Sequence, residues 1–131
     1  MKCISIETSR RDEMIDISME LQRAVTAAGV KDGLIVAHCP HTTAGLTINE
    51  GTDPAVKNDL IDCLSDLVPW DRIYGHAEGN SPAHVKASLM GASVTLIVED
   101  GRVVLGQWQR VFFCEFDGPR PRNVYLKLMA S

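Results

Sequence analysis

The stretch Ser93-Val94-Thr95-Leu96-Ile97-Val98-Glu99-Asp100-Gly101-Arg102-Val103-Val104-Leu105 decides the fold class. Its central Asp-Gly pair is a strong hairpin signal, so Ser93–Glu99 and Arg102–Leu105 are predicted as the two strands. Two more strands are predicted over Gln107–Phe116 and Asn123–Met129, which makes the last third of the chain a series of strands. This order does not fit a simple βαβ alternation. It predicts an α+β fold, with a largely antiparallel sheet or sandwich and a few packed helices.

The first two-thirds of the chain supplies the helices and the remaining strands. Pro54 is a strong helix-start signal with Thr52 or Asp53 as its cap, and this helix is expected to end before Pro69. The other two helices are expected over Met19–Ala28, with Ser18 as N-cap and Gly29 at the C-terminal end, and from Ser81-Pro82 to about Leu89. Strands are expected over Cys3–Glu7, Met14–Ile17, Leu34–Cys39 and Gly45–Asn49, of which the apolar run 34–39 suits a central strand.

Length and composition limit the class of protein. A chain of 131 residues is expected to form one domain over residues 1–131. The net charge of −4 argues against broad nucleic-acid binding, which depends on clustered Lys and Arg. No apolar run approaches the roughly 20 residues that span a bilayer. The four cysteines are far apart, as free thiols in a reducing compartment would be, so we expect a cytoplasmic protein with no membrane partner.

Three of the four histidines lie in polar segments that are able to orient an imidazole. His41 leads His41-Thr42-Thr43, directly after an apolar strand and a proline, while His76 and His84 flank a glycine-containing loop. Neutral imidazole is both a common metal ligand and a common acid–base group. The spacing alone leaves two hypotheses open, three-histidine metal ligation and metal-free ligand binding or acid–base chemistry. A turn in which the threonines cap local backbone is the structural alternative.

Other polar side chains are candidates for the same site. Asn49 and Glu50 end a predicted strand, and the carboxylate of Glu50 could act as a base or orient a histidine. Arg120 and Arg122 lie in a Pro-rich turn and could bind a phosphate or carboxylate, or equally form a solvated loop or subunit contact. Glu115 lies inside an apolar strand, so its carboxylate needs a partner, either across an interface or in a site.

Several segments carry a resemblance to a known family. They are His41-Thr42-Thr43-Ala44-Gly45-Leu46-Thr47-Ile48-Asn49-Glu50 with Asp53-Pro54, His76 to Asn80, Pro82-Ala83-His84-Val85-Lys86-Ala87-Ser88-Leu89, Gly101-Arg102, Gly106, Trp108-Gln109 and Cys114-Glu115. In this order they cover nearly the whole chain from about Ile4, and the chain resembles the YjbQ-like family of small bacterial and archaeal proteins. The resemblance implies a compact α+β fold with a curved antiparallel sheet, assembled as a homotrimer.

The same resemblance implies a polar cavity that binds a divalent metal, zinc, or an anion. Its metal ligands map onto His41, His76 and His84. The family is sometimes labelled a secondary thiamine-phosphate synthase, but that reaction needs a phosphate grip and usually Mg²⁺, and this chain has no clear pyrophosphate loop or aspartate cluster. The chain departs from the family pattern at Gln107, where a small residue is usual, and at Arg110, where glycine is usual.

These observations predict a histidine-lined pocket for a small phosphorylated or anionic metabolite. In the enzyme version the three histidines hold the metal, Glu50 is the base, Asn49 positions the substrate, and Arg120 or Arg122 neutralises its charge. Further ligand-binding residues would be Thr42, Thr43, Asn80 and Arg122. The rival hypothesis is a non-catalytic trimer that binds or senses a metabolite or metal with the same pocket.

Overall fold

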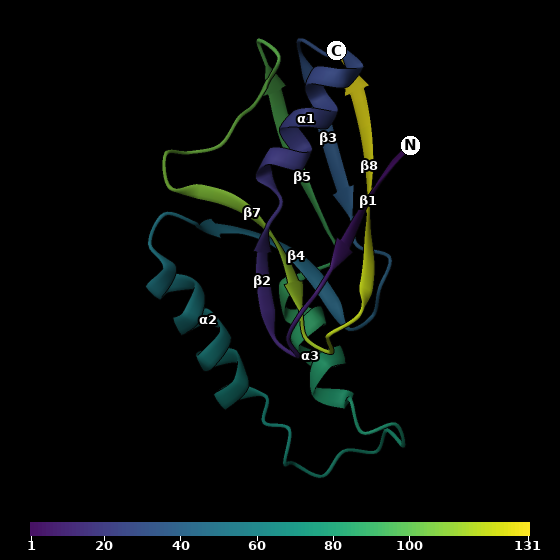
Figure 1. Cartoon of the computed structure of the whole chain (residues 1–131), viewed down its shortest axis with the longest axis vertical. Coiled ribbons are helices and arrows are strands. Elements are labelled where there is room, and N and C mark those ends of the chain that lie inside the picture. Colours follow the sequence, from purple (N-terminus) through teal and green to yellow (C-terminus); the bar gives the residue numbers. More distant parts are fainter.

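The computed structural model describes residues 1–131 and contains two antiparallel sheets and three helices, which confirms the predicted α+β class (Figure 1). One sheet has five strands in the order β1-β8-β3-β5-β6, and the other has three in the order β2-β7-β4. The elements are β1 (Lys2–Glu7), β2 (Glu13–Asp16), α1 (Ser18–Ala28), β3 (Gly33–His38), β4 (Ala44–Glu50), α2 (Pro54–Leu67), α3 (Ser81–Met90), β5 (Ser93–Glu99), β6 (Arg102–Val103), β7 (Gln109–Glu115) and β8 (Pro121–Ala130).

The strand β3 is central, as its apolar sequence predicts, because it pairs with β5 on one side and β8 on the other. Alternate residues point to opposite faces of a strand, so Ile35 and Ala37 are completely buried in the main core. His38 has the opposite orientation and is exposed on the outer face of the sheet. His38 was expected to be a core or an interface residue. It is not a core residue, because its side chain lies on the outer face of the sheet, and a role at an interface stays a prediction.

Strand β7 connects the two hydrophobic cores of the protein. Val111 and Phe113 enter the main core, between the sheets and against α1. Phe112, Cys114 and the following Phe116 point the other way, into a second core that α2 and α3 cover. In Figure 1, α1 lies with β3 and β5 in the upper half, and α3 lies below the three-stranded sheet. Burial on both faces explains why residues 109–116 lack a polar alternation.

Local signals account for the element ends. The Asp53 carboxylate accepts a hydrogen bond from the Ala55 N–H at 3.0 Å, which identifies Asp53 as the cap of α2. Asp100 and Gly101 both have positive φ, 51° and 74°, as a two-residue hairpin turn with the matching twist requires. Ser18 differs from its expected capping role. Its hydroxyl accepts a hydrogen bond from the Val111 N–H at 2.8 Å, so it ties α1 to β7 instead.

Two further sequence predictions concern the cysteines and the membrane. All four cysteines are free thiols, as their spacing predicts. None of the helices combines the length and the apolar character that crossing a bilayer would require.

Candidate functional site

His41 and His84 line one pocket of about 520 Å³, a size within the range of small-molecule sites. His41 follows β3 and precedes β4, whereas His84 belongs to α3, so the tertiary fold brings together segments that are distant in sequence. The lining has two imidazoles, from His41 and His84, and two hydroxyls, from Thr42 and Ser88, and it contains no Asp or Glu. The other lining residues are small: Ala44, Ala87, Gly91 and Ala92.

The pocket forms because α3 docks closely against the start of β4. The Leu46 N–H donates to the Gly91 carbonyl at 3.0 Å, and the Cys39 N–H donates to the Ala92 carbonyl at 2.7 Å. Gly45 permits this approach, since a Cβ built there would lie 2.6 Å from the Gly91 carbonyl oxygen. The absence of a side chain at position 45 therefore sets the distance between the two histidine-bearing segments.

The His41 ring is held by the backbone of β8. The Asn123 N–H donates a hydrogen bond to Nε2 of His41 at 2.9 Å. A neutral imidazole has one N–H and one lone pair, and here the lone pair on Nε2 is occupied. The proton of neutral His41 therefore lies on Nδ1, the only other ring nitrogen.

A buried ion pair lies behind His41. Arg122 donates from Nε to Oε1 of Glu115 at 2.8 Å and from Nη2 to Oε2, and Nη2 also donates to the Thr43 hydroxyl at 2.8 Å. The exposed fraction is 4% for the Arg122 side chain and 0% for Glu115. The hydroxyl of Thr8 donates to Oε1 of Glu115 at 2.8 Å and completes the network. Arg122 and Thr43, both expected to contact a ligand, are thus occupied inside the protein, and the partner of Glu115 lies within its own chain.

This environment shifts two pKa values. Burial and the positive charge of Arg122 hold the pKa of His41 below its ordinary value, so His41 is neutral near pH 7. Burial alone would raise the pKa of Glu115. The hydrogen bonds from Arg122, from the Asp117 N–H and from Thr8 outweigh burial and hold the pKa of that carboxyl below its usual value. The pair is consequently ionised at neutral pH.

The structure does not fit the expected three-histidine zinc site within one chain. No group of three or more His, Cys, Asp or Glu side chains is placed to hold an ion. His76 and His84 do meet, with ring centroids 5.4 Å apart in an edge-to-face arrangement. Metal ligation needs a free nitrogen lone pair, and the lone pair of His41 is taken by Asn123. The pairing of His76 with His84 is the part of the expected ligand set that one chain assembles.

Asn80 and Arg120 meet at the residue Asp117, at the base of α3. Oδ2 of Asp117 accepts from Nδ2 of Asn80 at 2.9 Å and from Nη2 of Arg120 at 3.1 Å. Arg120 is half exposed, and its charge contributes to the lowered pKa of His41. Oδ1 of Asn80 is buried without a hydrogen-bond partner. Arg120 therefore lies within electrostatic reach of the pocket, although it does not line it.

Asn49 and Glu50 lie at the opposite end of β4 from the histidines. Glu50 lies six positions after Ala44 along the strand, which corresponds to about 20 Å. The Glu50 carboxylate accepts from the Thr52 N–H, and Asn49 accepts from the Glu50 N–H, so both side chains stabilise the turn after the strand. Contrary to the expectation, a single chain does not bring them to the histidine pocket, because β4 is extended.

The two departures from the family pattern belong to this distal end. Arg110 pairs in register with Asn49, and its guanidinium donates to the carbonyl oxygens of Gln107 and Gln109. A Cβ at Gly51 would lie 2.2 Å from Cγ of Arg110, so the arginine packs directly over that glycine. The histidine pocket is unaffected by either departure.

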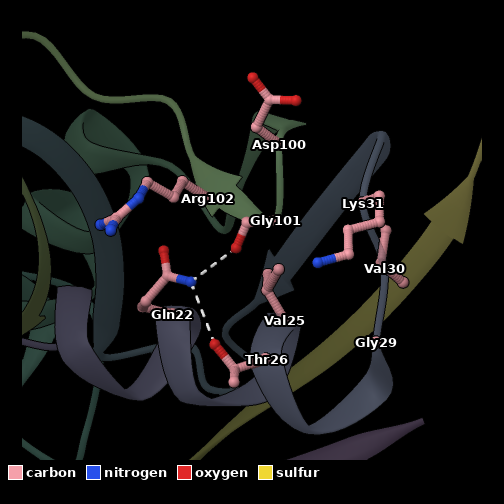
Figure 2. Close-up of a pocket in the computed structure, with 9 residues that line it drawn as sticks. All are labelled: Gln22, Val25, Thr26, Gly29, Val30, Lys31, Asp100, Gly101 and Arg102. Atoms are coloured by element: carbon pink, nitrogen blue, oxygen red, sulfur yellow. Dashed lines mark hydrogen bonds between the residues drawn. The ribbon is translucent and has the colours of Figure 1, made fainter.

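A different hollow of about 340 Å³ lies between α1 and the β5–β6 turn (Figure 2). Gln22 uses both ends of its amide there, donating to the Gly101 carbonyl at 2.9 Å and accepting from the Val103 N–H at 3.0 Å. Figure 2 shows the side chains of Asp100 and Arg102 pointing away from one another at its rim. The polar groups do not converge on a ligand, and Gln22 has a structural role in fastening the hairpin to α1.

Sequence reasoning missed Ser88 and Asp117. Ser88 follows His84 by four residues on a helix, a spacing that puts both on one face and could have identified it. Its hydroxyl donates to the His84 carbonyl at 3.1 Å. The Asn123 N–H that holds His41 is a backbone group, and no sequence signal reveals it.

Comparison with known proteins gives a consistent assignment. The family model described as UPF0047 protein YjbQ-like matches residues 2–131. The protein YugU of Bacillus subtilis is 48% identical over 130 residues, which cover 98% of both chains. The protein MJ1081 of Methanocaldococcus jannaschii is 51% identical over 126 residues, covering 96% of this chain and 91% of that protein.

Solved structures agree with this result. A crystal structure of a yjbq/upf0047 family protein from Clostridium acetobutylicum superposes with a TM-score of 0.97 at 49% identity, covering 98% of this chain and 100% of that one. A YbjQ-like protein from Sulfolobus solfataricus superposes with a TM-score of 0.95 at 28% identity, over 99% and 96% of the two chains. The matches extend over both cores and over the histidine pocket, and the chain therefore belongs to the UPF0047, YjbQ-like family.

Proposed function

We propose that the pocket between β4 and α3 binds a small phosphorylated or otherwise anionic metabolite. The observation that carries this proposal is the chemistry of the lining, in which two imidazoles and the hydroxyl of Thr42 occur without any carboxylate. Ser88 also lines the pocket, but its hydroxyl proton is donated to the His84 carbonyl. Hydrogen-bond donors without nearby negative charge favour an oxyanion over a cation. Arg120 at the base of α3 contributes to the lowered pKa of His41, but its charge is paired with that of Asp117, so the preference rests on the lining itself.

His84 is the group best suited to proton transfer in this pocket. Its helix is fixed against β4, and its ring contacts that of His76. Thr42 is exposed, and its hydroxyl is free to contact the ligand. This arrangement serves an enzyme that protonates or deprotonates a bound metabolite, and it serves equally a protein that only binds it.

Turnover separates these two versions, and Glu50 is the residue to test. Since Glu50 lies at the far end of β4, it reaches a histidine pocket only from a neighbouring chain of the homotrimer that the family resemblance implies. Mixed trimers of Glu50→Gln and His84→Ala subunits should then regain about one third of the activity, because each mixed trimer contains one intact pocket. A sensing protein shows no turnover in any of these forms.

The first experiment measures binding of inorganic phosphate by calorimetry to wild type and to His84→Ala. The matched control is His38→Ala, since His38 is exposed on the outer face of the sheet and away from the pocket. We expect His84→Ala to weaken binding about tenfold or more, the effect of one hydrogen bond to a charged group, and His38→Ala to leave it unchanged. Equal affinities in all three proteins, or no binding to wild type, would remove the basis of the proposal.

Zinc remains the alternative ligand for the same histidines. Elemental analysis of untagged protein, beside His41→Ala and His84→Ala, decides this point. About one zinc per chain, lost in both variants, would favour a metal site that is completed by a neighbouring subunit. Absence of zinc in all three proteins, before and after incubation with zinc, would favour the anion site in the cytoplasmic setting that we predict.

A further inference from the structure

We infer that His41 acts in this pocket as a neutral hydrogen-bond donor through Nδ1 and is not a metal ligand. The inference deepens the proposed function by assigning the proton of one pocket histidine and the kind of ligand atom that it contacts. It rests on the hydrogen bond from the Asn123 N–H to Nε2 of His41, at 2.9 Å.

Metal binding at either nitrogen of the His41 ring would break the hydrogen bond from Asn123. A metal bound at Nε2 would have to displace the Asn123 N–H and leave that backbone donor without an acceptor. A metal bound at Nδ1 would require the proton to move to Nε2, where it would face the Asn123 N–H, donor against donor. Either arrangement breaks the hydrogen bond between the Asn123 N–H and the His41 ring.

The Asn123 N–H and the backbone near His41 are both held beside one buried ion pair. Asn123 follows Arg122 directly in β8, and β8 is itself paired with β1 through Ser5 opposite Asn123. The guanidinium of Arg122 binds the hydroxyl of Thr43, two residues after His41. The Arg122 network therefore fixes the backbone on both sides of the contact.

The remaining nitrogen of His41 is open toward the solvent side. No protein group accepts a hydrogen bond from Nδ1, and Nδ1 is not among the buried polar atoms that lack a partner. Since His41 lines the pocket, its N–H is available to a ligand there. The matching ligand atom is an acceptor, such as a phosphate or carboxylate oxygen.

Nuclear magnetic resonance of protein labelled with ¹⁵N in histidine reads the proton position directly. We expect long-range ¹H–¹⁵N correlations to show His41 protonated at Nδ1, with exposed His38 as the internal reference, and inorganic phosphate to shift Nδ1 of His41. Added zinc should leave both His41 nitrogens unchanged. A proton on Nε2, or a zinc-induced shift of either His41 nitrogen, would overturn the inference.

A pair of substitutions tests the donor by affinity. The amide of His41→Asn places an N–H close to the position of Nδ1, whereas His41→Leu removes the donor. We expect His41→Leu to weaken phosphate binding about tenfold or more and His41→Asn to retain most of the affinity. Equal losses in both variants would contradict a donor role.

Failure of the proposed function has a different signature. In that case wild type does not bind phosphate at all, while the position of the proton and the response to zinc still decide whether His41 is a metal ligand. Zinc binding that survives in His41→Asn would support the exclusion of His41 from a metal site, and zinc binding lost in that variant would contradict it.

Discussion

The substitution Arg122→Met should destabilise the protein by about 3–5 kcal/mol at pH 7, the usual cost of removing one partner from a buried ion pair. Arg122 makes two hydrogen bonds to Glu115 and one to the Thr43 hydroxyl, and neither side chain of the pair is more than 4% exposed. The variant leaves the Glu115 carboxylate buried without its counter-charge. The loss is a large fraction of the roughly 5–15 kcal/mol that stabilises a typical domain.

The dependence on pH identifies the cause. In the wild type the pKa of Glu115 is below its ordinary value, so the stability that it contributes is present above the unfolded-state pKa and is lost as the pH falls through the folded-state pKa. Without Arg122, the pKa of Glu115 rises above its wild-type value because two of the causes that lower it are lost, so acid relieves the variant by protonating the carboxylate. The difference in free energy of unfolding between the two proteins should therefore shrink as the pH falls from 7 toward 4.

Urea unfolding at several pH values measures both effects. The matched control is Arg120→Met, because Arg120 also pairs with a carboxylate, that of Asp117, but is half exposed. Its cost should stay within about 1 kcal/mol, the range of surface ion pairs. The reasoning would be refuted if Arg122→Met cost no more than Arg120→Met, or if its cost were the same at pH 7 and pH 4.

Three further outcomes are expected. Asp53→Ala should lower the free energy of unfolding by about 1 kcal/mol in urea titration through loss of the α2 cap, and a neutral result would contradict the capping role. Gly45→Ala should lower the free energy of unfolding by about 1–3 kcal/mol and weaken phosphate binding, because the added Cβ would lie 2.6 Å from the Gly91 carbonyl oxygen. Unchanged affinity for phosphate would show that the pocket does not depend on this contact. A thiol reagent under native conditions should modify the exposed Cys3 and Cys63 and spare the buried Cys39 and Cys114. Burial raises the pKa of both buried thiols, that of Cys114 to about 12, and modification of all four cysteines would contradict this assignment.

Local signals in the sequence were sufficient for the elements of the fold. The Asp100-Gly101 pair predicts the hairpin because few residue pairs tolerate positive φ twice in succession. Pro54 after Asp53 predicts the start of α2 because proline suits the first helical turn. The apolar run of β3 predicts a central strand, since only a strand covered by neighbours and core tolerates so few polar residues.

The site was only partly predictable. The polar segments around His41 and His84 indicate a pocket, and the structure brings these two histidines to one. Asn49 and Glu50 seemed close to His41 in sequence, but an extended strand carries residues apart at about 3.3 Å each. Arginine is a common phosphate-binding residue, but here the guanidinium of Arg122 is bound to the carboxylate of Glu115. The two residues are seven positions apart across a turn, and because both are buried, each needs the other as its counter-charge.

The sequence by itself thus determined which segments become strands and helices and which side chains are able to do chemistry, because caps, turns and periodicity are properties of a few adjacent residues. Several strand ends differ from the prediction, for example β6, which ends at Val103 and not at Leu105. Only the tertiary structure decided what those side chains do. The proton of His41 is assigned by a backbone N–H of β8, 82 positions along the chain, and the pocket exists because Gly45 lets α3 approach β4. These are contacts between distant segments, and their geometry is set by packing that no local pattern encodes.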